Sequence, residues 1–151
     1  MRKKERQLGE AETLALLQEG EYGVLSTVGP DGFPYGVPLS YAFAEGCIWL
    51  HSAVSGHKVD NLAQCDRVSF CVVGPTQVLP EKFSTRYASA IVFGRVHQCV
   101  GEEQIAGLLH LVRKYAPEFL EKGRKYAEAA ASKTKVYRLD ITRMSGKARK
   151  E

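Results

Sequence analysis

A pair of cations, His57 and Lys58, follows Gly56 at a point where the sequence predicts the start of a helix. A helix dipole favours negative charge in its first turn, and a cation there costs from a few tenths to about 1 kcal/mol. Asp60 offsets part of this cost, so Lys58 could be an ordinary surface lysine. The alternative is that free backbone N–H groups, the glycine turn and the two cations bind an anion together. A phosphate suits this arrangement best, and Ser52, at the end of the preceding strand, could add a hydroxyl.

The other reactive side chains form no recognisable catalytic set. Cys47 and His51 share a strand face, but residues four apart in a strand are separated by about 13 Å, too far for one metal ion. His97 and Cys99 are closer, but no third ligand follows at a typical spacing, so the sequence predicts no metal site. Neither a nucleophile elbow nor a spaced carboxylate pair indicates hydrolysis. A phosphate anchor without an acid–base set indicates a cofactor that supplies its own chemistry.

Length and composition are typical of an ordinary globular domain. The chain has 151 residues, 44% of them hydrophobic and 25% charged, which is enough for a single domain with its own core. The formal net charge of +4 comes partly from residues 1–8 and 146–151, which we expect to be solvated basic tails. No nucleic-acid recognition motif accompanies this charge, so we expect no nucleic-acid partner.

Two features of the sequence bear on its location. No apolar stretch approaches the roughly 20 residues that span a bilayer, and the basic start is not followed by the apolar core of a secretory signal. The four cysteines show neither CxxC spacing nor the density of a disulfide framework. We therefore expect a cytoplasmic protein with reduced thiols and no membrane association.

Apolar periodicity and turn signals predict a small antiparallel barrel with a few helices. Six strands are expected, at residues 23–28, 35–43, 47–52, 67–74, 87–100 and 135–142. Helices are expected at 10–19, 57–65 and, with a break at Pro117, 101–131. Turn residues at Gly29–Gly32 and Ala44–Gly46 predict hairpins, and Pro38 favours an edge position or a bulge. Neither βαβ alternation nor a GxGxxG motif indicates a doubly wound sheet.

Several segments match one known family in the same order along the chain. They are "GEYGVLSTVGPDGFPYGVPLSY", "IWLHSAVSGHKVDNL", "VSFCVVG", "LPEKFSTRYASAIVFG" and "MSGKARK". Together they resemble the pyridoxamine 5′-phosphate oxidase-like flavoproteins, and most closely the nitroimidazole-resistance (Nim-like) branch. The resemblance implies a mainly β fold, a six-stranded antiparallel split β-barrel with flanking helices. It also implies FMN as cofactor and a homodimer with each flavin at the subunit interface.

The resemblance assigns roles to particular positions of this chain. The resemblance implies that the backbone of Val37, Pro38 and Leu39 lines the flavin ring and the ribityl chain. The strand end beside the phosphate would comprise His51 and Ser52, and the phosphate-binding turn would comprise Gly56, His57 and Lys58. Ser89 matches a strand position that faces the flavin from the same or the partner subunit. Lys147 lies in the last matching segment and would reach the cofactor cleft.

The chain also departs from the oxidases that give the family its name. Those oxidases usually carry Arg-Lys in the phosphate turn, where this chain has His57 and Lys58. A histidine is only partly charged near neutral pH, so phosphate affinity should be weaker and pH-dependent. The C-terminal Trp and Arg features used for the pyridoxal substrate are not evident, and we do not expect pyridoxamine phosphate oxidation. The Nim-like branch is similar in having histidine at this place, where it has been linked to the active site.

Three functions are compatible with these features. The first is an FMN-dependent oxidoreductase that takes electrons from a small donor and reduces nitro-heterocycles or quinones, with His57 positioning the acceptor or supplying a proton. The second is a flavin-binding module that stores FMN or senses redox state without efficient turnover. The third is a heme-binding protein, because the split-barrel class includes heme-linked members.

Overall fold

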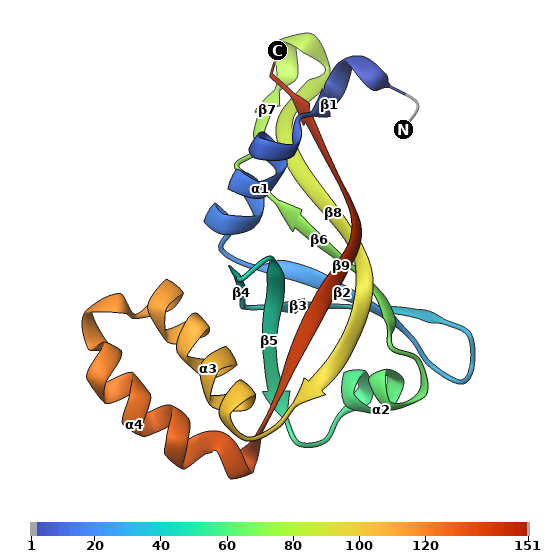
Figure 1. Ribbon diagram of the computed structural model, residues 1–151. Helices are drawn as coiled ribbons and strands as arrows, with labels where there is room; N and C mark the ends of the chain where they lie inside the picture. Colours follow the sequence, from blue (N-terminus) through green and yellow to red (C-terminus); the bar gives the residue numbers. More distant parts are fainter. Residues whose placement is uncertain (1–2, 151) are drawn as a thin grey trace.

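The computed structural model describes residues 3–150, and its strands form one strongly curled antiparallel sheet (Figure 1). The path through the sheet is β3-β2-β6-β8-β9-β5-β4, with β1 paired to β9 and β7 paired to β8. The strands are β1 (Gln7–Leu8), β2 (Gly23–Val28), β3 (Pro34–Leu39), β4 (Tyr41–Ala44), β5 (Cys47–Ala53), β6 (Arg67–Val73), β7 (Gln77–Leu79), β8 (Ser84–Cys99) and β9 (Thr134–Arg149). The helices are α1 (Glu10–Glu19), α2 (His57–Gln64), α3 (Glu102–Tyr115) and α4 (Leu120–Ala130). This confirms the mainly β split barrel with flanking helices.

The described chain contains nine strands, whereas six were expected. The expected strand at 35–43 is two strands, β3 and β4, separated at Ser40. These two strands lie at opposite ends of the sheet path, because β3 pairs with β2 and β4 pairs with β5. The strand β7 lies in the expected loop before β8 and pairs with its beginning. The alternation of apolar and polar residues is the same in one continuous strand and in two successive strands with different sheet partners. Sequence periodicity therefore cannot distinguish the two cases.

Residues 7–8 and 146–149, which fall in the basic tails expected at 1–8 and 146–151, belong to the sheet. β9 continues to Arg149, and β1 pairs with it through Gln7 opposite Lys147. Gly146 and Ala148 are buried, so the basic residues alternate with inward-facing small ones. A strand that has charged residues on one face and small residues on the other has the same composition as a basic tail. For this reason the sequence predicted a tail where the structure has a strand. Residues 1, 2 and 151 lie outside the described part.

The two predicted hairpins and the edge proline are confirmed. The amide of Gly32 donates to the carbonyl of Gly29 at 3.0 Å, which closes the turn between β2 and β3. Glu45 and Gly46 both have positive φ, 56° and 73°, as the two-residue turn between β4 and β5 requires. Pro38 lies on β3, the strand at one end of the sheet path, where its missing N–H costs no ladder hydrogen bond.

Two long strands, β8 and β9, form the spine of the sheet, and a bulge divides their pairing. Phe93 pairs with Arg143 and Gly94 with Ile141, so Thr142 is left without a partner in the ladder. At Gly94 the backbones come close: a Cβ there would lie 2.1 Å from the carbonyl oxygen of Asp140. Because the bulge adds one residue to β9, the outward side chains are at even-numbered positions before it and at odd-numbered positions after it, and they stay on one face of the sheet.

Two apolar cores hold the helices on the sheet. One fills the barrel and includes the fully buried Phe70, Tyr41 and Leu139, against which α1 packs through Leu17. The second lies between the sheet and α3 and includes Trp49 and Leu108. In Figure 1, α3 and α4 cover one side of β5, whereas α2 lies at the opposite side of the sheet. The helix α2 packs on the barrel through Leu62 and Asn61, and its first residue, His57, is exposed.

Two further expectations concern the thiols and the membrane. The four cysteines are all free of disulfides. Of the helices between residues 3 and 150, none has the length and apolar character needed to cross a bilayer.

Candidate functional site

The N-terminus of α2 is a backbone feature that only glycine forms readily. Gly56 has φ 139° and ψ 169°, a region that side chains other than hydrogen disfavour. A Cβ at this position would meet no atom within 4 Å, so the glycine is required by its backbone angles and not by crowding. Among the described residues no side chain caps this helix end. The first N–H groups of α2 therefore remain available to a ligand.

The two cations of the first turn differ in their surroundings. His57 is exposed, and its ring stacks on Tyr35 of β3 with 4.0 Å between centroids and 26° between planes. Lys58 is half-buried, and within residues 3–150 no carboxylate pairs with its ammonium. Its positive charge is thus held beside the uncapped helix end. The stacking on Tyr35 joins the turn to β3, a contact that sequence reasoning missed because it joins positions 22 apart.

The end of β5 brings His51 and Ser52 to the segment that leads into α2. Successive strand residues point to opposite faces, and Ser52 is the buried one. Its hydroxyl donates to the carbonyl of Ala53 at 2.7 Å. His51 is on the other, exposed face, where partial desolvation of its ring and the neighbouring charge of Lys58 lower its pKa. A lowered pKa favours the neutral form of this imidazole, so the charge at the end of β5 comes from Lys58 and not from His51.

The side chains of Val37 and Leu39 on β3 point into the barrel, where they pack against its core. Pro38, between them, is exposed on the outer face. Any ligand lying along the outer face of β3 would therefore meet the backbone and the ring of Pro38. The backbone role that the resemblance assigns to the three residues stays a prediction.

Ser89 and Lys147 form a second group, on the outer face of the sheet. They are direct partners in the ladder of β8 and β9, and Ser89 also pairs with Val73 of β6. The ammonium of Lys147 lies 5.8 Å from the centroid of the Tyr87 ring. Its hydrogen bond to the phenol lowers the pKa of Tyr87. Lys147 is therefore a fixed strand residue and not part of a mobile tail.

The two groups are far apart within one chain. Gly36 of β3 is in register with Phe93 of β8 through Ser26 and Ser69. Ser89 lies four residues further along β8, which corresponds to about 13 Å along the strand and about 14 Å across three strand spacings. The α2 turn, which contacts Tyr35 next to Gly36, thus lies several residues along the strands and three strands across from the Ser89–Lys147 pair. A single chain does not bring all the predicted residues around one small ligand.

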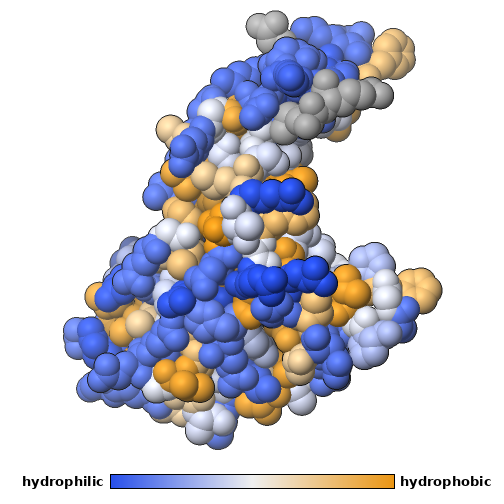
Figure 2. Space-filling view, turned by 45° about the vertical axis from the view of Figure 1, so that its right-hand side comes forward, coloured by the Kyte–Doolittle hydropathy of each residue, from blue (hydrophilic) through white to orange (hydrophobic). Residues whose placement is uncertain are grey.

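Between the two groups, apolar side chains are exposed on the outer face of the sheet. The exposed fractions are 53% for Val73, 39% for Ile91 and 41% for Phe93. We call these three residues the outer apolar patch. In Figure 2, apolar side chains also reach the surface at the narrow middle of the molecule, between more hydrophilic regions at either end. Large apolar side chains on adjacent strands of a sheet are typical of a surface that another protein covers.

A cleft of about 590 Å³ lies between α1 and the ends of β8 and β9, away from the α2 turn. Its lining combines apolar Leu8 and Leu16 with charged Glu12, Arg86 and Lys150. None of the predicted site residues lines it. A smaller cleft of about 160 Å³ lies between α2 and the barrel strands, where Val59 and Tyr137 contribute to its wall. The α2 turn itself is an open surface site.

Comparison with known proteins identifies the family. The family model described as pyridoxamine 5′-phosphate oxidase matches residues 9–148, and the chain belongs to this family. No curated protein matches the chain.

Solved structures share the fold over nearly the whole chain. A candidate 5-nitroimidazole antibiotic resistance protein from Bacteroides thetaiotaomicron is 21% identical with a TM-score of 0.80, over 94% of this chain and 86% of that one. An FAD-binding protein from Mesorhizobium loti is 26% identical with a TM-score of 0.68, over 95% and 97% of the two chains. An FAD- and heme-binding protein from Mycobacterium smegmatis is 20% identical with a TM-score of 0.81, over 97% and 74%.

Proposed function

We propose that this protein is a homodimeric FMN-binding flavoprotein that reduces small electron acceptors such as nitro-heterocycles or quinones. The observation that carries the proposal is the N-terminus of α2, where a glycine-only backbone, N–H groups without a side-chain cap and a lysine without a carboxylate partner, as far as residues 3–150 show, converge. Membership in the pyridoxamine 5′-phosphate oxidase family and the flavin-binding relatives support it.

The residues of the α2 turn fit a phosphate monoester. Gly56 leaves its surroundings open, so the phosphate oxygens can approach the first N–H groups of the helix. Lys58 supplies a full positive charge, and a charge-assisted contact is about twice as strong as a neutral one. His57 adds a second donor, held in place by its stack on Tyr35. The isoalloxazine ring would then lie along the outer face of β3, over Pro38.

A second copy of the chain would complete this site. The outer apolar patch is the surface that we propose for the contact, because Val73, Ile91 and Phe93 are exposed on adjacent strands. A two-fold contact brings the outer face of one copy against that of the other. Ser89 and Lys147 of one chain then approach the α2 turn of its partner. The two groups of predicted residues, which lie on different parts of the sheet within one chain, would then meet across the dimer contact.

When bound, FMN supplies the capacity to accept and release electrons or hydride. The residues of the protein bind the phosphate, position the ring and orient the acceptor. Lys58 and the α2 N–H groups hold the phosphate, while the β3 backbone fixes the position of the ring. His57 is exposed beside this position, so its imidazole can orient an acceptor or give it a proton. The stack on Tyr35 limits where the ring of His57 can point.

One experiment separates the candidate functions. The purified full-length protein is reconstituted with FMN, FAD or hemin in turn, and the absorption spectrum of the retained cofactor is recorded. We expect FMN to be retained at one per chain, and the reduced complex to be reoxidised by a quinone or nitroimidazole under anaerobic conditions. Retained FMN without reoxidation would identify a non-catalytic flavin module. A Soret band with no retained flavin would overturn the proposal in favour of a heme protein.

The role of His57 has its own readout. His57→Ala should slow acceptor reduction even when FMN is saturating, while Lys58→Ala should act mainly on FMN retention. Equal turnover of His57→Ala and the parent at saturating FMN would remove His57 from the catalytic role and leave it as a phosphate ligand.

A further inference from the structure

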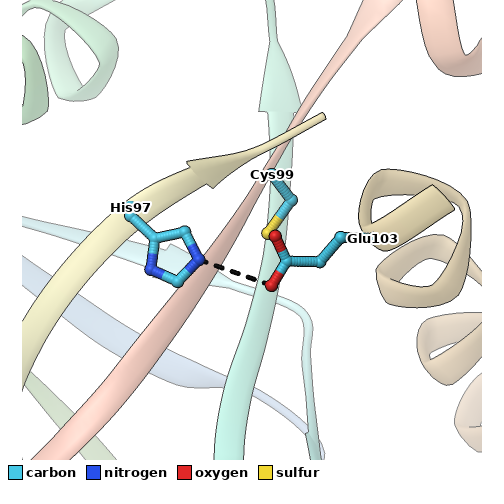
Figure 3. A group of neighbouring side chains, drawn as sticks. All are labelled: His97, Cys99 and Glu103. Atoms are coloured by element: carbon cyan, nitrogen blue, oxygen red, sulfur yellow. Dashed lines mark hydrogen bonds and ion pairs between the residues drawn. The ribbon is translucent and has the colours of Figure 1, made fainter. Parts of the chain in front are cut away.

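Three side chains that metals prefer meet where β8 ends and α3 begins. His97 and Cys99 are two residues apart on the outward face of β8, and Glu103 is in the first turn of α3 (Figure 3). Gly101, with φ 62°, turns the chain sharply between them. The turn folds Glu103 back over the strand, so that its carboxylate faces both the imidazole and the thiol.

The donor atoms lie within about 1 Å of the spacing that a small tetrahedral ion requires. Nε2 of His97, Sγ of Cys99 and a carboxylate oxygen of Glu103 all lie within 4.8 Å of one another. Nε2 of His97 and Oε1 of Glu103 are 3.4 Å apart. Metal–ligand bonds of about 2.0 to 2.3 Å in a tetrahedron place neighbouring ligand atoms roughly 3.4 to 3.7 Å apart. Side-chain rotations of about 1 Å therefore suffice to place the three atoms around one ion.

Asp140 and Arg138, which contact His97 and Glu103, orient these ligands. Nδ1 of His97 faces Oδ2 of Asp140 at 3.5 Å, while Nε2 faces Glu103. A metal-bound histidine characteristically gives its other ring N–H to a carboxylate. Arg138 pairs with both Glu103 and Asp140, which fixes the two carboxylates relative to each other. Cys47 donates its thiol to Asp140 at 3.4 Å and completes the arrangement.

Charge and exposure are also suitable for a divalent ion. Arg138 is the one cation paired with the two carboxylates of Glu103 and Asp140, so the group keeps a negative charge that a bound cation would offset. Cys99 is 1% exposed, whereas the side chain of His97 is 41% exposed. The sulfur thus lies on the buried side of the site and the imidazole on the solvent side, which leaves one coordination position open to solvent.

From this geometry we propose that His97, Cys99 and Glu103 form a binding site for a divalent transition metal, with Zn²⁺ as the preferred ion, separate from the proposed flavin site. A ligand set of imidazole, thiolate and carboxylate favours Zn²⁺ over Mg²⁺ or Ca²⁺, which take oxygen ligands. The ion pairs of Arg138 account for its two carboxylates without a metal. The observation that favours a metal is that an imidazole, a buried thiol and a carboxylate bring one donor atom each within 4.8 Å of one another. The sequence did not predict this site because the third ligand lies beyond a glycine turn.

The test is a titration of the chelator-treated full-length protein, without flavin, with Co²⁺ and with Zn²⁺. Co²⁺ should give a thiolate charge-transfer band and the visible bands of tetrahedral cobalt, at one ion per chain. Zn²⁺ affinity is measured by competition with a chromogenic chelator. Cys99→Ser should remove the charge-transfer band and weaken Zn²⁺ binding about a hundredfold, and Asp140→Asn should weaken it about tenfold. The matched control Cys65→Ser, a thiol near the end of α2, should leave both readouts unchanged.

His97→Gln is the second variant, because its side chain is partly exposed and its loss leaves the core intact. It should weaken Zn²⁺ binding by a similar factor. The absence of stoichiometric binding to the parent would overturn the proposal. So would a cobalt spectrum and Zn²⁺ affinity that survive both Cys99→Ser and His97→Gln, since the group would then be only an ion-pair network that ties α3 to the sheet.

Discussion

Replacing Lys58 by alanine removes the one full positive charge that the first turn of α2 holds permanently. Within residues 3–150 no carboxylate pairs with this ammonium, so its charge is available to a ligand. A hydrogen bond to a charged group contributes roughly 1.5–3 kcal/mol, which corresponds to one to two decades in a dissociation constant. The helix N–H groups and His57 remain in the variant. We therefore expect FMN affinity to fall about 10- to 100-fold and not to vanish.

The fold should not suffer from this substitution. A cation in the first turn of a helix is unfavourable by a few tenths to about 1 kcal/mol, so Lys58→Ala should leave the free energy of unfolding unchanged or slightly higher. Lys58→Arg keeps the charge and should keep most of the affinity. Lys122→Ala, at an exposed position of α4, is the matched surface control and should bind FMN like the parent.

The assay is a fluorescence titration of the apoprotein with FMN and, separately, with riboflavin, which lacks the phosphate. Lys58→Ala should weaken FMN binding and leave riboflavin binding within about twofold of the parent, because the lost contact is to the phosphate alone. Unchanged FMN affinity would refute the phosphate role of Lys58. An equal loss for both ligands would show that the substitution disturbs the site as a whole.

Three further predictions concern the support of the site and of the fold. Gly56→Ala places a side chain in a backbone region that only glycine adopts readily, so it should lower the free energy of unfolding by about 1–3 kcal/mol and weaken FMN binding. An unchanged midpoint of denaturant unfolding would contradict the assigned backbone geometry. Asn61→Ala removes the buried hydrogen bond, 3.0 Å long, that joins α2 to Thr27, and should lower the unfolding free energy by about 1–3 kcal/mol. Burial lowers the pKa of Lys114 to about 8, so between pH 8 and about 10 the unfolded chain holds a proton that the folded chain has lost. Lys114 should therefore add to stability as pH rises across that window, on the order of 1 kcal/mol, and the parent should gain this stability relative to Lys114→Met; a parallel pH profile for both proteins would contradict it.

The parts of this structure that local chemistry decides were predictable from the sequence. The hairpin at Glu45 and Gly46 needs positive φ at both positions, and the edge place of β3 follows from the missing N–H of Pro38. The start of α2 at Gly56 was predicted for the same reason, since a glycine before a polar helix turn is a local signal.

The parts that depend on distant pairing were not predictable. The basic residues near Lys147 have the composition of a tail, and only their pairing with β8 and β1 makes them a strand. The stack of Tyr35 on His57 and the approach of Glu103 to Cys99 join separate elements. No periodicity within either element encodes such contacts, because they arise from the way the sheet curls and the chain turns.

The central claim is that FMN binds at the α2 turn of a site that two copies complete. Sedimentation velocity of the FMN-loaded full-length protein, detected at a flavin wavelength, tests both halves at once. We predict that the flavin sediments with a particle of twice the 16.7 kDa chain mass, at one flavin per chain. Flavin that stays free, or that sediments with a single chain, would contradict this account.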